Sequence, residues 1–169
     1  MSLPRDLLAQ AALLATKERS RPRQASLRRS VSASYYALFH LLVDGAARRL
    51  VAGSDRRALR ICLGRAFDHG VMKRVARQFA ERNVSPRLSP GLNGLPLQEE
   101  IVRVAAAFVD LQQHRHEADY DMGRRFTRLE VLNIVSDAER AFVDWRAVRN
   151  SVQGDTFIVG LLTFEKIRQ

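Results

Sequence analysis

Two short segments of the chain carry the residues whose types and spacing could support chemistry. The first is Ala33–His40 (Ala-Ser-Tyr-Tyr-Ala-Leu-Phe-His), in which Tyr36 and His40 lie four residues apart. Side chains four apart share one face of a helix, so both polar tips would lie near a packed core and would need hydrogen-bond partners. These residues either line a polar cleft or pack as aromatic side chains whose tips are satisfied.

The second segment is Arg115–Tyr120 (Arg-His-Glu-Ala-Asp-Tyr). Arg115 continues an apolar helical stripe formed by Ile101, Val104, Phe108 and Leu111. A guanidinium on a buried face must be paired or must face an anion. Asp119 lies one helical turn further and can pair with Arg115 as a structural clamp. A guanidinium also binds phosphate bidentately, so a functional role for Arg115 stays open beside the clamp.

Several common chemistries are excluded by the motifs that the sequence lacks. It has no glycine-rich phosphate loop, no dinucleotide-binding fingerprint and no Gly-x-Ser-x-Gly elbow. One cysteine and four scattered histidines do not give zinc-site spacing, and the Glu-x-x-His pairs of a di-iron bundle are absent. We therefore expect neither a cofactor nor a metal.

The positive charge is concentrated in the first part of the chain. Residues 1–90 hold 18 basic and 6 acidic side chains, whereas residues 91–169 hold 10 and 12. Charge separated in this way attracts a polyanion such as nucleic acid. We expect four arginines to supply contacts to a phosphate backbone: Arg21, Arg23, Arg28 and Arg29. The alternative is a solvated arginine-rich surface without a specific partner.

The apolar periodicity and the capping signals predict an all-α fold. The expected helices cover about 3–17, 22–52, 55–66, 71–79, 97–115 and 127–149, with Gly53 as a helix terminator and Thr127 and Glu130 as a capping box. Residues 83–97 are rich in proline and glycine and predict a surface loop. For the segment 155–167 a helix and a strand are both open, and a helix is favoured. These elements predict an up-and-down bundle of four to five helices over residues 1–150, with a short C-terminal extension over 151–169.

Length and composition bound the class of protein. The chain has 169 residues, and its longest unbroken apolar runs have six residues, far fewer than a membrane span needs. The first twenty residues carry several charges and do not read as a signal peptide. The single cysteine, Cys62, fits a reducing compartment. We expect a cytoplasmic protein that has no membrane contact.

With both segments in hand, the chain resembles the HEPN family of small helical domains. The resemblance rests on the Ser34–His40 run, on the Arg115–Tyr120 run, and on His69-Gly70-Val71 followed by Phe79. It covers residues 1 to about 150. It implies a bundle of four to five helices that commonly dimerises. It also implies membership of bacterial toxin–antitoxin, abortive-infection or nucleotidyltransferase partner systems.

Many members of that family are metal-independent ribonucleases in which an arginine is followed, after four to six residues, by a histidine. Arg115 matches this arginine, and His116 matches a polar residue often found directly after it. The positions where the histidine should fall are occupied by Tyr120, Asp121 and Met122. None of these side chains replaces an imidazole as a general acid or base near neutral pH.

These observations predict a HEPN-like homodimer that binds RNA or a nucleotide-bearing partner, with its nuclease chemistry absent or altered. Arg115 would contact phosphate or hold Asp119, while Tyr36, His40 and Tyr120 would line the same cleft. One alternative is an active ribonuclease toxin in which His116 or His40 transfers the proton. The other is a non-catalytic module that packs against a nucleotidyltransferase.

Overall fold

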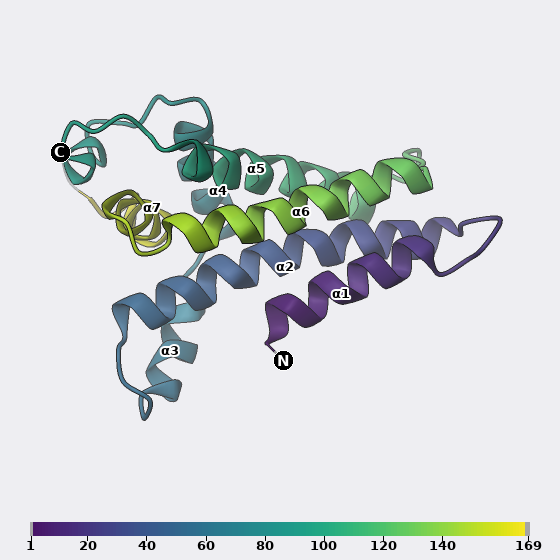
Figure 1. Cartoon of the computed structure of the whole chain (residues 1–169), viewed down its shortest axis with the longest axis horizontal. Coiled ribbons are helices and arrows are strands. Elements are labelled where there is room, and N and C mark those ends of the chain that lie inside the picture. Colours follow the sequence, from purple (N-terminus) through teal and green to yellow (C-terminus); the bar gives the residue numbers. More distant parts are fainter. Residues whose placement is uncertain (1, 168–169) are drawn as a thin grey trace. The chain divides into compact units, whose positions relative to one another are not determined.

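The computed structural model describes residues 2–167. Over these residues the chain forms seven α-helices and one short 3-10 helix, and it contains no strand (Figure 1). The helices are α1 (Leu3–Thr16), α2 (Gln24–Leu50), α3 (Arg57–Gly64), α4 (His69–Ala80), α5 (Glu99–Tyr120), α6 (Arg128–Val148) and α7 (Val152–Thr163), with the 3-10 helix η1 (Ser89–Leu92) between α4 and α5. The predicted all-α class is confirmed. The seven helices exceed the four to five expected for the bundle itself, but each of the six expected helical ranges overlaps a helix, and so does the C-terminal segment.

Local signals explain several helix ends. The predicted capping box at the start of α6 is confirmed, because the Glu130 N–H donates to the Thr127 hydroxyl at 3.2 Å and the Glu130 carboxylate accepts from the Thr127 N–H at 3.4 Å. The segment 155–167 is mostly helical. Its helix begins earlier than expected, at Val152, because the Ser151 hydroxyl accepts the Gly154 N–H. The last two residues of the expected extension 151–169 lie outside the described residues.

The C-terminal ends of α2 and α5 differ from the sequence prediction. Helix α2 ends at Leu50, and Gly53 adopts a φ of +102° in the loop that follows rather than directly after the helix. Helix α5 continues to Tyr120, five residues beyond the expected end at Arg115. No glycine or proline interrupts the chain before Gly123, so nothing in these residues breaks the helix earlier.

The chain divides into two compact units, each made from two separate segments. Unit 1 comprises the residues up to His40 together with Ala107–Val143. Unit 2 comprises Leu41–Ala106 together with the residues from Asp144 onward. Helices α2, α5 and α6 therefore contribute residues to both units.

Unit 1 is packed around the N-terminal half of α2. Tyr35 is fully buried, and its ring centroid lies 5.6 Å from that of Phe108 on α5. Four serines of α2 are also buried: Ser26, Ser30, Ser32 and Ser34. The Ser30 hydroxyl donates to the Ala11 carbonyl at 2.7 Å, which fixes α1 alongside α2 (Figure 1). Small polar side chains at these positions let the helices approach closely while their hydroxyl groups stay hydrogen-bonded.

Unit 2 is organised by the contact between α4 and α7. The rings of Phe79 and Phe157 meet edge to face with centroids 4.9 Å apart. Gly160 of α7 lies against Val75 and Leu88, where an added Cβ would come within 3.0 and 2.8 Å of their methyl groups. The buried face of α4 is apolar, and its opposite face carries three cations, Lys73, Arg74 and Arg77. The packing of one face of α4 thus determines which cations it presents on the other.

Candidate functional site

Arg115 lies at the end of the buried stripe of α5. Its side chain is 20% exposed, although the residues before it on the stripe are almost fully buried. The helix continues past Arg115, so Asp119 lies one turn further on the same face. The Arg115 Nε and the Asp119 Oδ2 are 2.8 Å apart. Among the described residues the Arg115 Nε–H has no acceptor in hydrogen-bond geometry, so this contact is an ion pair rather than a directional hydrogen bond.

A second residue holds the carboxylate of Asp119. The Ser32 hydroxyl, on α2, donates to the Asp119 Oδ1 at 2.6 Å. Asp119 is therefore bound on both oxygens, once by a cation of its own helix and once by a hydroxyl of the neighbouring helix. Sequence reasoning missed Ser32. The signal was present, because Ser32 lies four residues before Tyr36 and therefore shares its helix face.

Three tyrosine rings surround the Arg115 guanidinium. Its Cζ lies 5.9, 5.5 and 5.6 Å from the ring centroids of Tyr35, Tyr36 and Tyr120. A guanidinium within about 6 Å of a ring centroid is attracted by the electrons of the ring face. Arg115 thus has both a carboxylate and an aromatic cage, which together compensate for the water it has lost.

The surroundings of Arg115 keep its guanidinium positively charged. Burial, the largest single effect on the Arg115 pKa, lowers it, but Tyr36, Asp119 and Tyr120 together raise the pKa above its ordinary value. The guanidinium is therefore always protonated. It can bind an anion or stabilise a developing negative charge, but it cannot accept a proton as a general base.

The two candidate histidines of the site lie at its two ends. The His40 ring centroid is 6.4 Å from that of Tyr36, and the His116 ring centroid is 5.2 Å from that of Tyr120. Burial lowers the pKa of His40, so its imidazole is neutral at physiological pH. His116 is exposed. The structure thus brings the site residues predicted from both segments into one continuous cluster within unit 1.

Arg28 is held inside unit 1. Its guanidinium donates to the carbonyl groups of Ala118 and Asp121, both at 2.8 Å, and also to that of Arg124. The last carbonyl groups of a helix lack partners within the helix and carry partial negative charge. Arg28 therefore caps the C-terminus of α5, and its donors are engaged by the protein.

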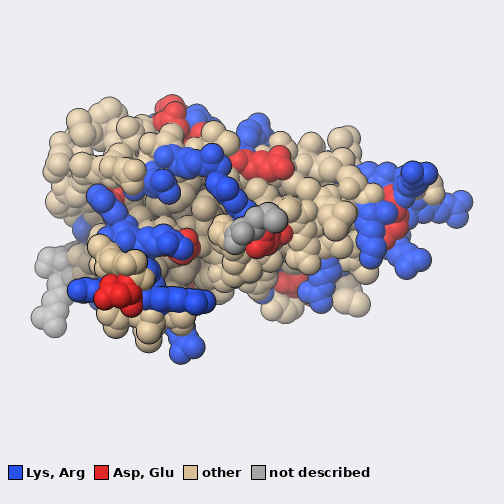
Figure 2. All heavy atoms as spheres, turned by 60° about the horizontal axis from the view of Figure 1, so that its bottom comes forward, with Lys and Arg blue, Asp and Glu red and all other residues tan. Residues whose placement is uncertain are grey.

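Five exposed cations of unit 1 lie instead in the connections between α1 and α2 and between α5 and α6. Gln24 exchanges two hydrogen bonds with the backbone of Phe126, at 2.8 and 2.9 Å, which brings the α5–α6 connection next to the start of α2. We call the exposed cations of these two connections the basic end: Lys17, Arg19, Arg21, Arg23 and Arg125. Figure 2 shows basic side chains crowded there, at its right-hand edge. Arg29, also exposed, lies further along α2.

The carboxylates near the basic end already have partners. Glu18 accepts a hydrogen bond from the Ser26 hydroxyl at 2.8 Å, the main cause of its lowered pKa. Glu117 and Glu130 both bind Arg124. Within the described residues, none of the five cations of the basic end forms an ion pair. Their charge is therefore free to act on a ligand.

Two further findings bear on the chemistry that the chain can support. No three His, Cys, Asp or Glu side chains among residues 2–167 are grouped so that they could hold a metal ion. In the same part of the chain, no helix combines the length and the apolar character needed to cross a membrane.

No protein-family model, no curated protein and no solved structure matches the chain.

Proposed function

We propose that this protein binds RNA through the basic end of unit 1. The observation that carries the proposal is the set of five exposed cations that form no ion pair among the described residues, beside carboxylates that are already bound by other side chains. Contacts of this kind attract the phosphate backbone without reading its sequence. The resemblance to the HEPN family supports the same class of ligand. It also supports, as part of the proposal, a homodimer in a toxin–antitoxin or defence system.

The Arg115 cluster is a structural and anion-facing centre in this proposal, and nuclease chemistry is absent or altered. Arg115 is permanently charged, and its nearest titratable neighbours are Asp119 and three tyrosines. The exposed edge of the cluster, at Tyr120 and His116, is where a phosphate would approach Arg115. We expect no metal-independent cleavage of total RNA above background by the wild-type protein.

A ribonuclease is the second candidate function, and one observation favours it. The His116 ring lies against the Tyr120 ring, and the Tyr120 ring lies against the Arg115 guanidinium. One aromatic ring therefore separates an imidazole from the cation. Robust cleavage in the presence of a chelator, lost in both Arg115→Ala and His116→Ala, would establish this function. A third candidate, a module that packs on a nucleotidyltransferase, would use the basic end as the interface with that partner.

The binding proposal is tested by fluorescence polarisation with a labelled single-stranded RNA at several salt concentrations. Each neutralised phosphate on a single strand contributes about 0.7 to the slope of log affinity against log salt, so five contacts predict a slope of roughly −3 to −4. Arg21→Glu combined with Arg23→Glu should abolish most of this binding. The matched control is Arg146→Glu combined with Arg149→Glu, which changes the net charge equally on exposed positions near the end of α6.

The outcomes separate the candidates. Loss of affinity in the Arg21/Arg23 variant but not in the control supports the proposal. Equal losses in both variants would mean that only net charge matters and that the basic end is no site. Salt-insensitive binding, or no binding at low salt, would overturn the proposal. Arg28 is left unchanged in this test because its loss would act on folding.

A further inference from the structure

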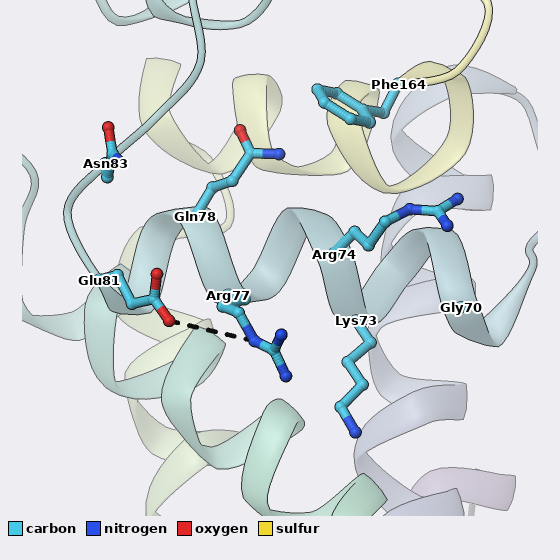
Figure 3. Close-up of a pocket in the computed structure, with 8 residues that line it drawn as sticks. All are labelled: Gly70, Lys73, Arg74, Arg77, Gln78, Glu81, Asn83 and Phe164. Atoms are coloured by element: carbon cyan, nitrogen blue, oxygen red, sulfur yellow. Dashed lines mark ion pairs between the residues drawn. The ribbon is translucent and has the colours of Figure 1, made fainter.

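A surface pocket of about 290 Å³ lies along the exposed face of α4 in unit 2. Gly70 begins it near the start of α4, and the residues one, two and three turns further continue it: Lys73, Arg74, Arg77, Gln78 and Glu81. Phe164, just after α7, closes one side (Figure 3). The volume is just below the range of about 300–1,000 Å³ for small-molecule sites. The pocket therefore suits a ligand the size of a mononucleotide.

The charge of the pocket is positive and only partly neutralised. Lys73 forms no ion pair within the described residues, and Arg77 has only a distant one, with its Nε 4.0 Å from the Glu81 Oε1. Arg74 is bound by Glu165. With Glu165 counted, three cations face two carboxylates, and Lys73 and Arg77 are the cations left for a ligand. A phosphomonoester, which carries nearly two negative charges at neutral pH, would be attracted by these two cations.

The polar groups at the far edge of the pocket are held in place by the turn that ends α4. Arg82 adopts a φ of 55°, in the left-handed region, while its N–H and that of Asn83 donate to the carbonyls of Phe79 and Gln78 at 3.2 and 2.9 Å. This is the Schellman arrangement of a helix C-terminus. The Gln78 side-chain oxygen accepts the Ser85 N–H at 3.0 Å. With its oxygen engaged, Gln78 turns its amide nitrogen toward Phe164 and Arg74 (Figure 3).

An aromatic face completes the pocket. The Phe164 ring lines it on the side opposite Lys73 (Figure 3). The Arg87 Cζ lies 5.8 Å from the centroid of this ring, a cation–π contact that restrains its orientation. A planar heterocycle can stack on such a ring, and base–aromatic stacking is favourable for every nucleobase.

We propose that the α4 pocket binds a nucleoside 5′-monophosphate group, with the phosphate on Lys73 and Arg77 and the base against Phe164. The group belongs either to a free nucleotide or to the 5′ end of an RNA, because the chemistry presented to the pocket is the same. The site is separate from the Arg115 cluster and from the basic end. It does not depend on the RNA-binding proposal.

Isothermal titration calorimetry of the full chain tests the site with adenosine 5′-monophosphate, adenosine and ribose 5-phosphate. We expect the nucleotide to bind more tightly than either fragment. Lys73→Ala and Arg77→Ala should each weaken nucleotide binding about tenfold, as expected for a charged hydrogen-bond donor. The exposed Arg146→Ala is the matched control and should leave the affinity unchanged. Glu81→Gln should strengthen binding by about twofold to fivefold, because it removes the repulsion of the phosphate and releases Arg77.

Three outcomes would overturn the proposal: no binding of the nucleotide, equal affinity for the nucleotide and either fragment, or affinity unaffected by both cation variants.

The source of the group is decided with the 5′-phosphorylated dinucleotide pApA, which is too short to span the basic end. Affinity equal to that of the mononucleotide assigns the pocket to an RNA 5′ end. Much weaker binding assigns it to a free nucleotide. Loss of RNA binding in the Arg21/Arg23 variant leaves these titrations unchanged.

Discussion

The Arg115 cluster of unit 1 and the α4 pocket of unit 2 differ in whether their cations already have partners within the protein. Arg115 has an ion pair with Asp119 and three surrounding aromatic rings, and Arg28 close by is bound to backbone carbonyl groups. Lys73 and Arg77 face a hollow surface, and within residues 2–167 they have between them one distant carboxylate, that of Glu81. A net charge of +10 therefore says little by itself. The partner that each cation already has decides whether it stabilises the fold or remains available for a ligand.

Removing Arg28 should give the largest effect on stability. Arg28→Ala leaves the carbonyl groups at and just beyond the end of α5 without their charged donor, and losing such a donor costs roughly 1.5–3 kcal/mol. We expect the free energy of unfolding, measured by urea denaturation, to fall by about 2–3 kcal/mol. Its exposed neighbour is the control, because Arg29→Ala should change stability by less than about 0.5 kcal/mol. Equal effects at both positions would remove the distinction between engaged and free arginines.

Arg115→Ala should have the next largest effect. The change strands Asp119 beside Ser32 and empties the tyrosine cage, so we expect a loss of about 1–2 kcal/mol. Asp119→Ala should be coupled to it, with the double variant less destabilised than the sum of the two single variants. If Arg115→Ala instead leaves stability unchanged or raises it while RNA binding disappears, Arg115 faces a ligand and the clamp interpretation is wrong.

The pH dependence of stability should show a smaller effect through His40. Burial lowers the pKa of His40 in the folded chain, so the unfolded chain takes up its proton first as the pH falls. The stabilisation is complete above the ordinary histidine pKa of about 6.5 and should decrease as the pH falls from about 7 to 5. Thermal melts across this window should show the decrease. It should become shallower in His40→Gln and remain in the exposed-site variant His116→Gln.

The cations of the α4 pocket should have the smallest effect on folding. Lys73→Ala combined with Arg77→Ala breaks only the distant contact to Glu81, so the free energy of unfolding should change by less than about 0.5 kcal/mol. Chemical denaturation checks this value. A loss comparable to that of Arg115→Ala would show that these cations hold the fold together. The contrast between the two regions would then disappear.

Local sequence signals predicted most of the secondary structure. The capping box at Thr127 and the apolar stripe that includes Phe108 depend on residues within a few turns of one another. The pairing of Arg115 with Asp119 was one of two open interpretations for the same reason, since four residues make one helical turn. The prediction ended α5 at Arg115, where the apolar stripe stops, although the sequence holds no glycine or proline between there and Gly123.

Contacts between distant segments could not be predicted from the sequence. The acceptors of Arg28 lie about ninety residues away, so the sequence alone left it among the surface arginines. The α4 pocket depends in the same way on the approach of Phe164 to α4. The sequence near Phe164 and the sequence of α4 contain no local signal that predicts this contact. The sequence reveals the sign and spacing of charges. Which of them are neutralised follows only from tertiary packing.

The division of each unit into two chain segments has a consequence for synthesis. Residues up to His40 must wait for Ala107–Val143 before unit 1 can close, and Leu41–Ala106 must wait for the residues from Asp144 onward. A nascent chain that ends before Ala107 therefore has only part of each core. Closing such long loops slows folding, because the entropy is lost before the distant contacts form. While the chain emerges from the ribosome, the face of α2 that carries Tyr35 stays uncovered until α5 has followed.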